Sequence, residues 1–215
     1  MLERNAEFKP MPRLERGVFL LAGVSGSGKG SVGEVLLRDG VIAAHASMVT
    51  GCATLPTTPH TLESRLTSEQ PPSYASPLEY LRHCVTHGLL IPDAWTQAVI
   101  ETQLERLDAK RWALDGYPRT VGAATHLLSA LEARGIPLVG AVELRVPFEV
   151  MRDRLLSRGR ADDTPAALER RLEFYRESVL PTLDWLETHG VRVHRVDASG
   201  ELASVVRDVK NRLGH

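Results

Sequence analysis

Apolar residues along this chain recur in two alternating patterns. Short apolar runs predict buried strands, and apolar residues spaced three or four positions apart predict helices. The predicted strands cover 18–22, 41–46, 111–114, 138–144 and 191–196. The predicted helices cover 29–38, 76–88, 93–107, 121–134, 148–157, a long segment that includes 168–175, and 202–213. This alternation favours an α/β fold, with a parallel five-stranded sheet covered on both faces and ligands bound beyond the carboxyl ends of its strands.

The segment 47–77 breaks this alternation. Its five prolines stand among Ser and Thr residues, and no regular spacing runs through it. We expect 47–92 to form a small, partly helical insertion in a single domain over 17–215, because no repeat or linker divides the rest. The charged start of the chain, 1–16, has no apolar signal-peptide core and is expected to be a flexible tail.

Charge and cysteine content narrow the class of partner. The chain has 26 Lys and Arg residues against 27 Asp and Glu residues, so no overall field attracts nucleic acid or a membrane surface. No apolar run approaches the length of about 18 residues that a membrane span requires. Cys52 and Cys84 are too few for a disulfide framework and too far apart for a Cys-x-x-Cys zinc site. We expect a cytoplasmic monomer or weak homo-oligomer that binds small molecules.

The first candidate site is a glycine-rich loop, Gly-Val-Ser-Gly-Ser-Gly-Lys-Gly-Ser over 23–31, between a predicted strand and a predicted helix. Glycines let successive backbone N–H groups point inward, and the helix N-terminus adds its dipole, so the loop is suited to phosphate. Lys29 would reach the β- and γ-phosphates, and the Ser31 hydroxyl would face a phosphate-bound Mg²⁺. The alternative is a plain glycine-rich turn.

A second candidate follows the strand 111–114. Asp115 would lie over the same sheet edge as the glycine loop, where a carboxylate can orient the waters of Mg²⁺. Arg119 presents a planar group suited to bidentate contact with phosphate. The alternative is a turn followed by a surface arginine.

A third candidate is a cluster of arginines late in the chain. Arg154 and Arg158 are four positions apart, which places them on one helical face where like charges repel unless an anion lies between them. Further members follow at Arg160, Arg170 and Arg171. The alternative is a solvated charged face with local ion pairs.

These motifs, in this order, resemble those of the adenylate kinase family of nucleoside monophosphate kinases. The matching segments are 23–31 (G-x-P-G-S-G-K-G-T in the family), 88–93 (G-x-L-V-P-D), 114–120 (D-G-[FY]-P-R-T), 154–159 (R-L-L-x-R-G), 160–163 (R-x-D-D), 171–172 (R-L) and 196–200, the loop around the donor adenine. Only 47–77 aligns poorly.

The resemblance implies a P-loop kinase that uses ATP and Mg²⁺ to phosphorylate a nucleoside monophosphate, with AMP as the leading acceptor. The residues implied in transfer are Lys29, Arg119, Arg158, Arg160 and Arg171. Those implied in ATP binding are Gly26, Ser27, Gly28, Lys29, Gly30, Ser31, Arg154, Ala198 and Gly200. Those implied in acceptor binding are Arg65, Leu90, Ile91, Gly116, Arg119, Arg160 and Arg171, and those implied around Mg²⁺ are Ser31, Asp115, Asp162 and Asp163.

Departures from the family pattern keep other functions open. Ala123 stands where the family has the glutamine that hydrogen-bonds the acceptor base, and Arg65 is only a candidate for the acceptor arginine. Kinases for CMP, UMP, a deoxynucleotide or a small alcohol therefore remain alternatives, as does a nucleotide-binding module with weak ATPase activity. Ser25 and Ser31 replace a proline and a threonine but keep the loop's backbone and its hydroxyl.

The predicted lid, 158–164, is very short, because Arg160 follows Gly159 directly. Lid closure excludes water from phosphoryl transfer, so we expect ATP to be hydrolysed at a measurable rate without acceptor unless the insertion or a partner subunit shields the site. Phosphate release with ATP and Mg²⁺ alone measures this leak. A rate negligible beside that of transfer would contradict it.

Overall fold

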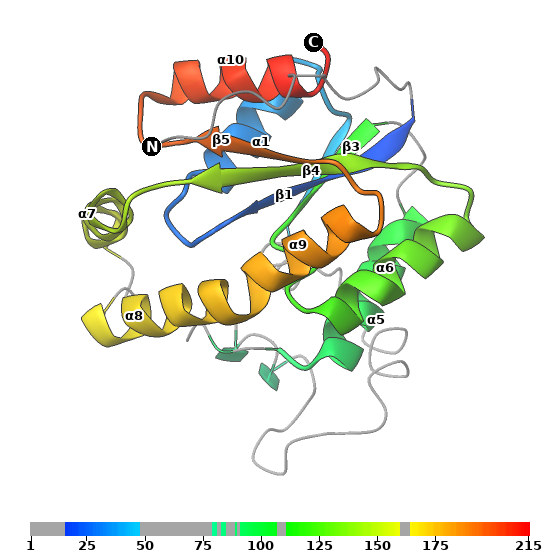
Figure 1. Cartoon of the computed structure of the whole chain (residues 1–215), viewed down its shortest axis with the longest axis horizontal. Coiled ribbons are helices and arrows are strands. Elements are labelled where there is room, and N and C mark those ends of the chain that lie inside the picture. The colour runs from blue at the N-terminus through cyan, green and yellow to red at the C-terminus, as the bar shows by residue number, and fades with distance from the viewer. Residues whose placement is uncertain are drawn as a thin grey trace.

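A five-stranded parallel sheet forms the centre of the structure (Figure 1). The computed structural model describes residues 16–47, 79–80, 83–84, 89, 91–106, 111–159 and 164–215. The strands, in the spatial order β2-β3-β1-β4-β5, are β1 (Gly17–Gly23), β2 (Ala44–Ser47), β3 (Arg111–Asp115), β4 (Leu138–Arg145) and β5 (Val193–Asp197). The predicted α/β fold with five parallel strands is confirmed.

Helices cover both faces of this sheet (Figure 1). On one face lie α1 (Lys29–Arg38) and α10 (Leu202–Arg212), and on the other lie α5 (Asp93–Arg106), α6 (Val121–Ala133) and α9 (Leu180–Thr188). Beyond the carboxyl ends of the strands lie α7 (Phe148–Arg158) and α8 (Pro165–Phe174), and the π-helical segment η1 (Tyr175–Val179) joins α8 to α9.

The central strand β1 shows why its apolar run is nearly continuous. Val18 and Leu20 point into the core beneath α5, α6 and α9, whereas Phe19 and Leu21 point into the core beneath α1 and α10. All four side chains are at most 1% exposed. Because successive side chains of a strand point to opposite faces, a strand buried on both faces requires apolar residues at every position.

The second strand begins later than the sequence predicts. The N–H groups of Val41 and Ile42 both donate to the carbonyl of Leu36, at 2.9 and 3.3 Å, and so close the C-terminal end of α1. These apolar residues therefore extend the core under α1 without joining the sheet. Pairing begins with the N–H of Ala43, which donates to the carbonyl of Arg111 at 2.7 Å.

The long predicted helix runs from Pro165 to Thr188 with a π-helical turn inside it. Thr164 begins it by accepting a hydrogen bond from the N–H of Ala167 at 3.3 Å, and proline occupies its first turn, both typical N-terminal features. Nothing in the apolar spacing predicts the π turn. Of the predicted helix over 76–88, residues 79, 80, 83 and 84 are helical, and the rest lies outside the described residues, as do 1–15 and most of 47–92.

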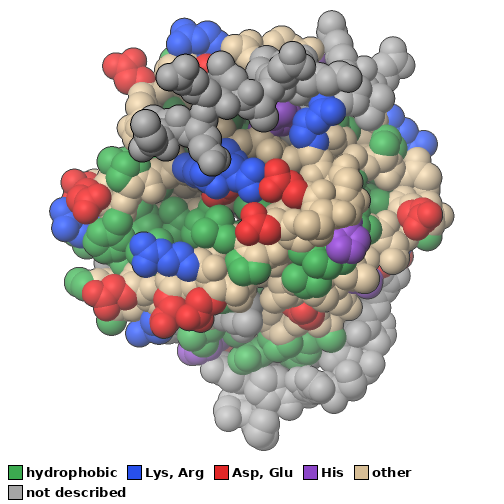
Figure 2. Space-filling view, viewed as in Figure 1, with side chains coloured by type: hydrophobic (Ala, Val, Ile, Leu, Met, Phe, Trp, Pro, Cys, Tyr) green, Lys and Arg blue, Asp and Glu red, His purple; other side chains and the backbone are tan. Residues whose placement is uncertain are grey.

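Charges of both signs are interspersed on the face shown in Figure 2. Ion pairs among the described residues include Lys210 with Asp39 at 2.7 Å and Arg195 with Asp184 at 3.3 Å. Among the helices that the structure describes, none combines the length and apolar character needed to cross a membrane.

The contact between α1 and β2 depends on Gly33. A Cβ at this position would lie 2.6 Å from Nδ1 of His45, whereas a Cβ at Gly30, in the same helix, would meet nothing within 4 Å. We expect Gly33→Ala to lower the free energy of unfolding by about 1 to 3 kcal/mol through overpacking. Gly30→Ala is the matched control and should leave stability unchanged or raise it by up to about 1 kcal/mol, since alanine favours the helix.

Urea unfolding of both variants measures this difference. Equal stability of the two proteins would contradict the assigned contact.

Candidate functional site

A cleft of about 930 Å³ opens at the carboxyl ends of the strands, where the sequence predicts the ligand. The glycine loop after β1 forms one wall, and the turn after β3 forms another. The end of α7, the helix α8 and the loop after β5 also contribute to its lining. Segments far apart in the sequence therefore surround one space.

The glycine loop has a backbone that side chains would obstruct. Gly26 and Gly28 have φ angles of 81° and 94°, in the left-handed region that favours glycine. A Cβ at Gly23 would lie 2.7 Å from the carbonyl oxygen of Leu144, so only glycine allows this close approach to β4. The loop leads directly into the N-terminus of α1, where no side chain caps the backbone N–H groups. This arrangement fits phosphate oxygens, which accept hydrogen bonds from such groups.

Ser27 strengthens the fit to an anionic ligand. Its side chain lies in the cleft wall and is 1% exposed, and its Oγ has no hydrogen-bond partner within the described part of the chain. A buried hydroxyl without a partner is costly, and a phosphate oxygen would accept a hydrogen bond from it.

Lys29 lies among charged groups of both signs. Its Nζ donates to the carbonyls of Gly23 and Val24, at 2.7 and 3.1 Å, which holds the ammonium against the loop. Burial lowers the pKa of Lys29, the carboxylate of Asp115 raises it, and the positive charges of Arg119 and Arg158 lower it further. Phosphate oxygens would favour the charged form of this side chain.

Asp115 ends β3 in the cleft wall and is 6% exposed. Its Cα lies in register with those of Leu21 on β1 and Ser47 on β2. On the β2 side, Nε2 of His45 lies 3.4 Å from Oδ2 of Asp115. His45 was not predicted as a site residue, and its proximity to Asp115 follows from the pairing of β2 with β3.

The oxygen ligands of Asp115 and Ser31 suit Mg²⁺, which usually binds through one or two protein oxygens together with substrate phosphates and waters. Both residues line the cleft. Over the residues that the structure describes, no group of three or more His, Cys, Asp or Glu side chains could hold a metal by itself. The described donor set therefore fits a metal that arrives with a nucleotide.

Arg119 lies in a turn that several hydrogen bonds hold in place. Its Nε donates to the carbonyl of Gly116 at 2.8 Å, and the N–H of Gly116 donates to Leu21 at 3.3 Å. The next residue, Thr120, begins α6 by accepting a hydrogen bond from the N–H of Ala123, and its Oγ1 donates to Oδ2 of Asp93 at 2.6 Å. These bonds hold the guanidinium in the cleft wall.

Arg154 joins α7 to the loop after β5. Its Nη2 donates to the carbonyls of Ser199 and Gly200, at 3.2 and 3.3 Å. Ala198 and Leu202 line the cleft beside it. The structure therefore brings together Arg154 and the 198–200 loop, both of which the resemblance assigns to the donor adenine.

Most of the residues predicted for the site line this one cleft. They are Gly26, Ser27, Gly28, Lys29, Gly30, Ser31, Ile91, Asp115, Gly116, Arg119, Arg154, Arg158, Arg171, Ala198 and Gly200. Five others lie outside the described residues, and their roles stay predictions: Arg65, Leu90, Arg160, Asp162 and Asp163. The lid at 158–164 is described only at its two ends.

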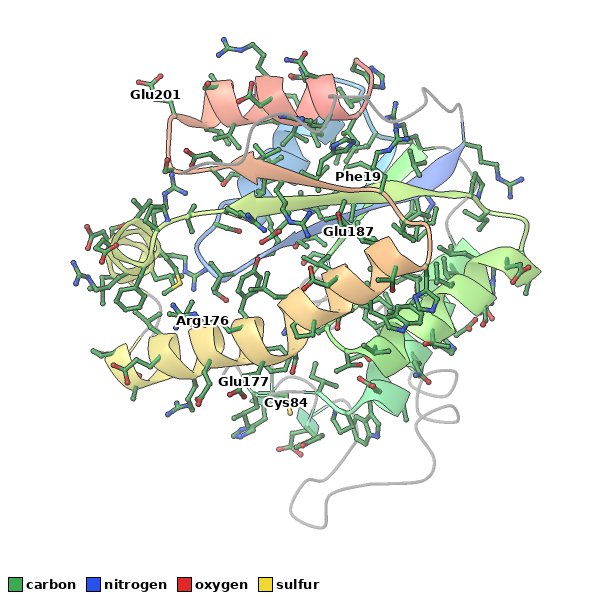
Figure 3. All side chains as sticks on the ribbon, viewed as in Figure 1. Phe19, Cys84, Arg176, Glu177, Glu187 and Glu201 are labelled. Carbon is green, nitrogen blue, oxygen red and sulfur yellow. The ribbon has the colours of Figure 1, made fainter. Side chains whose placement is uncertain are left out.

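Other residues of the cleft wall were not predicted as site residues. They include Glu34, Ser47, Cys84, Leu89 and Tyr175, whereas Arg170, which also lines the cleft, belongs to the predicted arginine cluster. In the view of Figure 3 Cys84 lies below α8 and the strands lie above it, and Cys84 belongs to the core cluster that includes Leu20 and Trp95. Tyr175 continues the apolar spacing of its helix, which indicates packing and gives no signal of its hydroxyl's partner.

Ala123 lies at the start of α6 and is 1% exposed. Its N–H donates to Oγ1 of Thr120 at 3.1 Å, and its carbonyl accepts from the hydroxyl of Tyr117 at 3.1 Å. It is not one of the residues that line the described cleft. No side-chain amide is therefore available at this position to bind an acceptor base.

The fold and the cleft together define an α/β protein with a phosphate-binding loop and converging basic side chains. The family model for adenylate kinase matches residues 74–191, which begin after the glycine loop. The chain belongs to the adenylate kinase family, whose members are phosphotransferases that act on nucleoside monophosphates. The glycine loop, outside the matched residues, is consistent with this assignment.

Individual relatives agree with the family model. The chain is 38% identical over 128 residues to an adenylate kinase of Mycobacteroides abscessus, a match that covers 59% of this chain and 69% of the relative. It is 37% identical over 133 residues to one of Leuconostoc mesenteroides, covering 61% and 71%. It is 35% identical over 138 residues to one of Xylella fastidiosa, covering 62% and 73%.

Lys29 provides the direct test of the phosphate site. We expect Lys29→Ala to lower kcat at least about 100-fold, because it removes the positive charge that would stabilise the negatively charged phosphoryl group during transfer. The fold should remain intact, since the hydrogen bonds of the ammonium go to carbonyls of the loop itself. Lys210→Ala is the matched control, because Lys210 pairs with Asp39 away from the cleft. ADP formation and thermal unfolding measure both effects, and an active Lys29→Ala protein would contradict the assignment.

Proposed function

We propose that the chain transfers the γ-phosphoryl group of ATP to AMP, producing two molecules of ADP, with Mg²⁺ as the cofactor. The observation that carries this proposal is that Lys29 and Arg119, from the glycine loop and the turn after β3, line the same cleft as Arg158 and Arg171. Such a cleft can hold two phosphate groups with positive charge between them. A protein that only binds ATP would need the donor phosphate site and would not need the arginines at the acceptor and transfer positions.

In this reaction an oxygen of the acceptor phosphate attacks the γ-phosphorus, and the bond to the oxygen that bridges the β- and γ-phosphorus atoms breaks. No covalent intermediate with the protein is required, so catalysis consists of positioning and charge stabilisation. The N–H groups of the loop and Lys29 would bind the donor phosphates, and Arg119 would bind the acceptor phosphate. Arg158 and Arg171, with Arg160, would stabilise the charge that spreads over the equatorial oxygens.

Mg²⁺ would neutralise charge on the donor phosphates. Ser31 would contribute its hydroxyl, and Asp115 would orient waters of the ion, with Asp162 and Asp163 as further predicted acceptors of hydrogen bonds from those waters. Arg154, Ala198 and Gly200 would contact the donor adenine.

Ala123 favours a second candidate acceptor. In the family pattern a glutamine at this position hydrogen-bonds the acceptor base, and here a buried alanine replaces it. Loss of one such amide contact weakens discrimination between bases by about 1 to 3 kcal/mol. A kinase for CMP, UMP or a deoxynucleotide is therefore the alternative.

A single domain over 17–215, a cytoplasmic location and a monomeric or weakly associating state remain predictions.

A coupled assay of ADP formation with ATP and Mg²⁺ against a panel of monophosphates, with a control without acceptor, tests the proposal. Fast turnover with AMP supports it, and preference for another monophosphate replaces AMP by that acceptor. A panel that stays at the background rate would contradict nucleotide kinase activity.

Arg119 tests how the cleft divides between donor and acceptor. We expect Arg119→Ala to lower kcat/KM for AMP by about 100-fold or more, because it removes a charged contact to the acceptor phosphate, and to change ATP affinity less than about threefold. Arg152→Ala is the matched control, since Arg152 pairs with Asp153 on the exposed side of α7. Equal losses of ATP and AMP binding would place Arg119 elsewhere in the reaction.

A further inference from the structure

A charged carboxyl group lies inside the sheet, apart from the predicted site residues. Glu143, on β4, is 1% exposed. Its Cα lies in register with that of Ala22 on β1, one residue before the glycine loop. A buried carboxylate is costly unless other groups compensate its charge and fill its hydrogen-bonding positions.

Side chains from three directions compensate the charge, and the hydrogen bonds among these contacts go to Oε1. The hydroxyl of Tyr175 donates to Oε1 of Glu143 at 2.6 Å, and Nε of Arg145 donates to the same oxygen at 3.1 Å. Nε of Arg195, on β5, lies 3.3 Å from Oε2. Arg195 is held in turn by Glu187 of α9, at 2.6 Å, and Figure 3 shows Glu187 beside the strands. The carboxylate therefore connects β4, β5 and the long helix.

Tyr175 occupies the junction of that helix. It is the first residue of η1, between α8 and α9. The α9 side is fixed in the sheet's core through Leu183 and Leu186, whereas α8 packs its Leu168 against α7 and the glycine loop. π-helical turns inside α-helices often occur at functional sites. The hydroxyl of Tyr175 joins this turn to β4.

Arg171 lies four positions before Tyr175, on the same side of the helix, and both side chains line the cleft. Partial burial raises the pKa of Tyr175, and the hydrogen bond to Glu143 raises it further, so the hydroxyl keeps its proton at neutral pH. Because Arg171 and Tyr175 belong to one continuous helix, a displacement of that helix at Tyr175 would move the guanidinium of Arg171 in the cleft.

We propose that the hydrogen bond from Tyr175 to Glu143 positions Arg171 for phosphoryl transfer. The inference rests on the proposed function, in which Arg171 stabilises the transferring group. Tyr175 and Glu143 act through Arg171 and are positioning residues. A purely structural role, in which Tyr175 only satisfies a buried carboxylate, is the competing explanation.

The first test is Tyr175→Phe, which keeps the ring and removes the hydroxyl. We expect kcat to fall about 10- to 100-fold, because a small displacement of a charged group in the cleft lowers the rate of transfer by such a factor. KM for ATP should change less than about twofold. In an Arg171→Ala background the same substitution should cause no further loss of kcat. Glu143→Gln should keep most of the activity, since its carbonyl oxygen still accepts the hydrogen bond, whereas Glu143→Ala should resemble Tyr175→Phe.

Thr182→Val is the matched control. Its hydroxyl donates to the carbonyl of Ser178 at 2.7 Å in the same long helix, is buried, and lies outside the cleft wall. Loss of this hydrogen bond should lower stability and leave kcat unchanged. A structural role for Tyr175 would give the same result as this control. An unchanged kcat in Tyr175→Phe, or an equal loss with and without Arg171, would overturn the inference.

Hydrogen exchange provides a readout that does not depend on turnover. We expect faster amide exchange over α8 in Tyr175→Phe than in wild type or Thr182→Val, because α8 loses its connection to β4. Unchanged exchange over α8 would overturn the inference even if the wild-type protein phosphorylates none of the monophosphates tested. If the wild-type protein phosphorylates none of the monophosphates, the proposed function fails, and the exchange experiment still tests the hydrogen bond because it requires no substrate.

Discussion

All five strands run in one direction, and the candidate site depends on this constraint. Parallel strands place their carboxyl ends at one edge of the sheet, so the loop after β1, the turn after β3 and the loop after β5 meet there although they are far apart in the sequence. Because the backbone hydrogen bonds of the sheet set these positions, the phosphate-binding loop and Asp115 face one cleft whichever side chains cover the sheet. An antiparallel pairing of β3 would have moved Asp115 to the opposite edge.

The charges in this cleft are useful because they are poorly solvated. Burial and the neighbouring arginines disfavour the charged form of Lys29, and Asp115 partly offsets them. Such a cleft favours a polyanion, which relieves the repulsion among the cations as it binds. The same physical rule applies to Glu143, where the sign is reversed and Arg145 and Arg195 balance a buried anion.

The sequence predicts the fold and the glycine loop well because both depend on local rules. Apolar periodicity locates the five strands, and the glycines of 23–28 require backbone angles that other residues rarely adopt. The sequence predicts the ends of helices and strands less well where hydrogen bonds between elements override the local apolar pattern. Val41 and Ile42 are apolar like a strand but cap α1, and the π turn at Tyr175 leaves no trace in the spacing.

The sequence by itself determined the order of the elements, the phosphate loop and the charged residues available to it, since these follow from local backbone preference and hydrophobic pattern. Only the tertiary structure decided which of those residues meet. The approach of His45 to Asp115 requires β2 beside β3, and the bond from Tyr175 to Glu143 requires the long helix to cross β4. Such contacts join residues distant in sequence through strand order and helix packing, which no local pattern encodes.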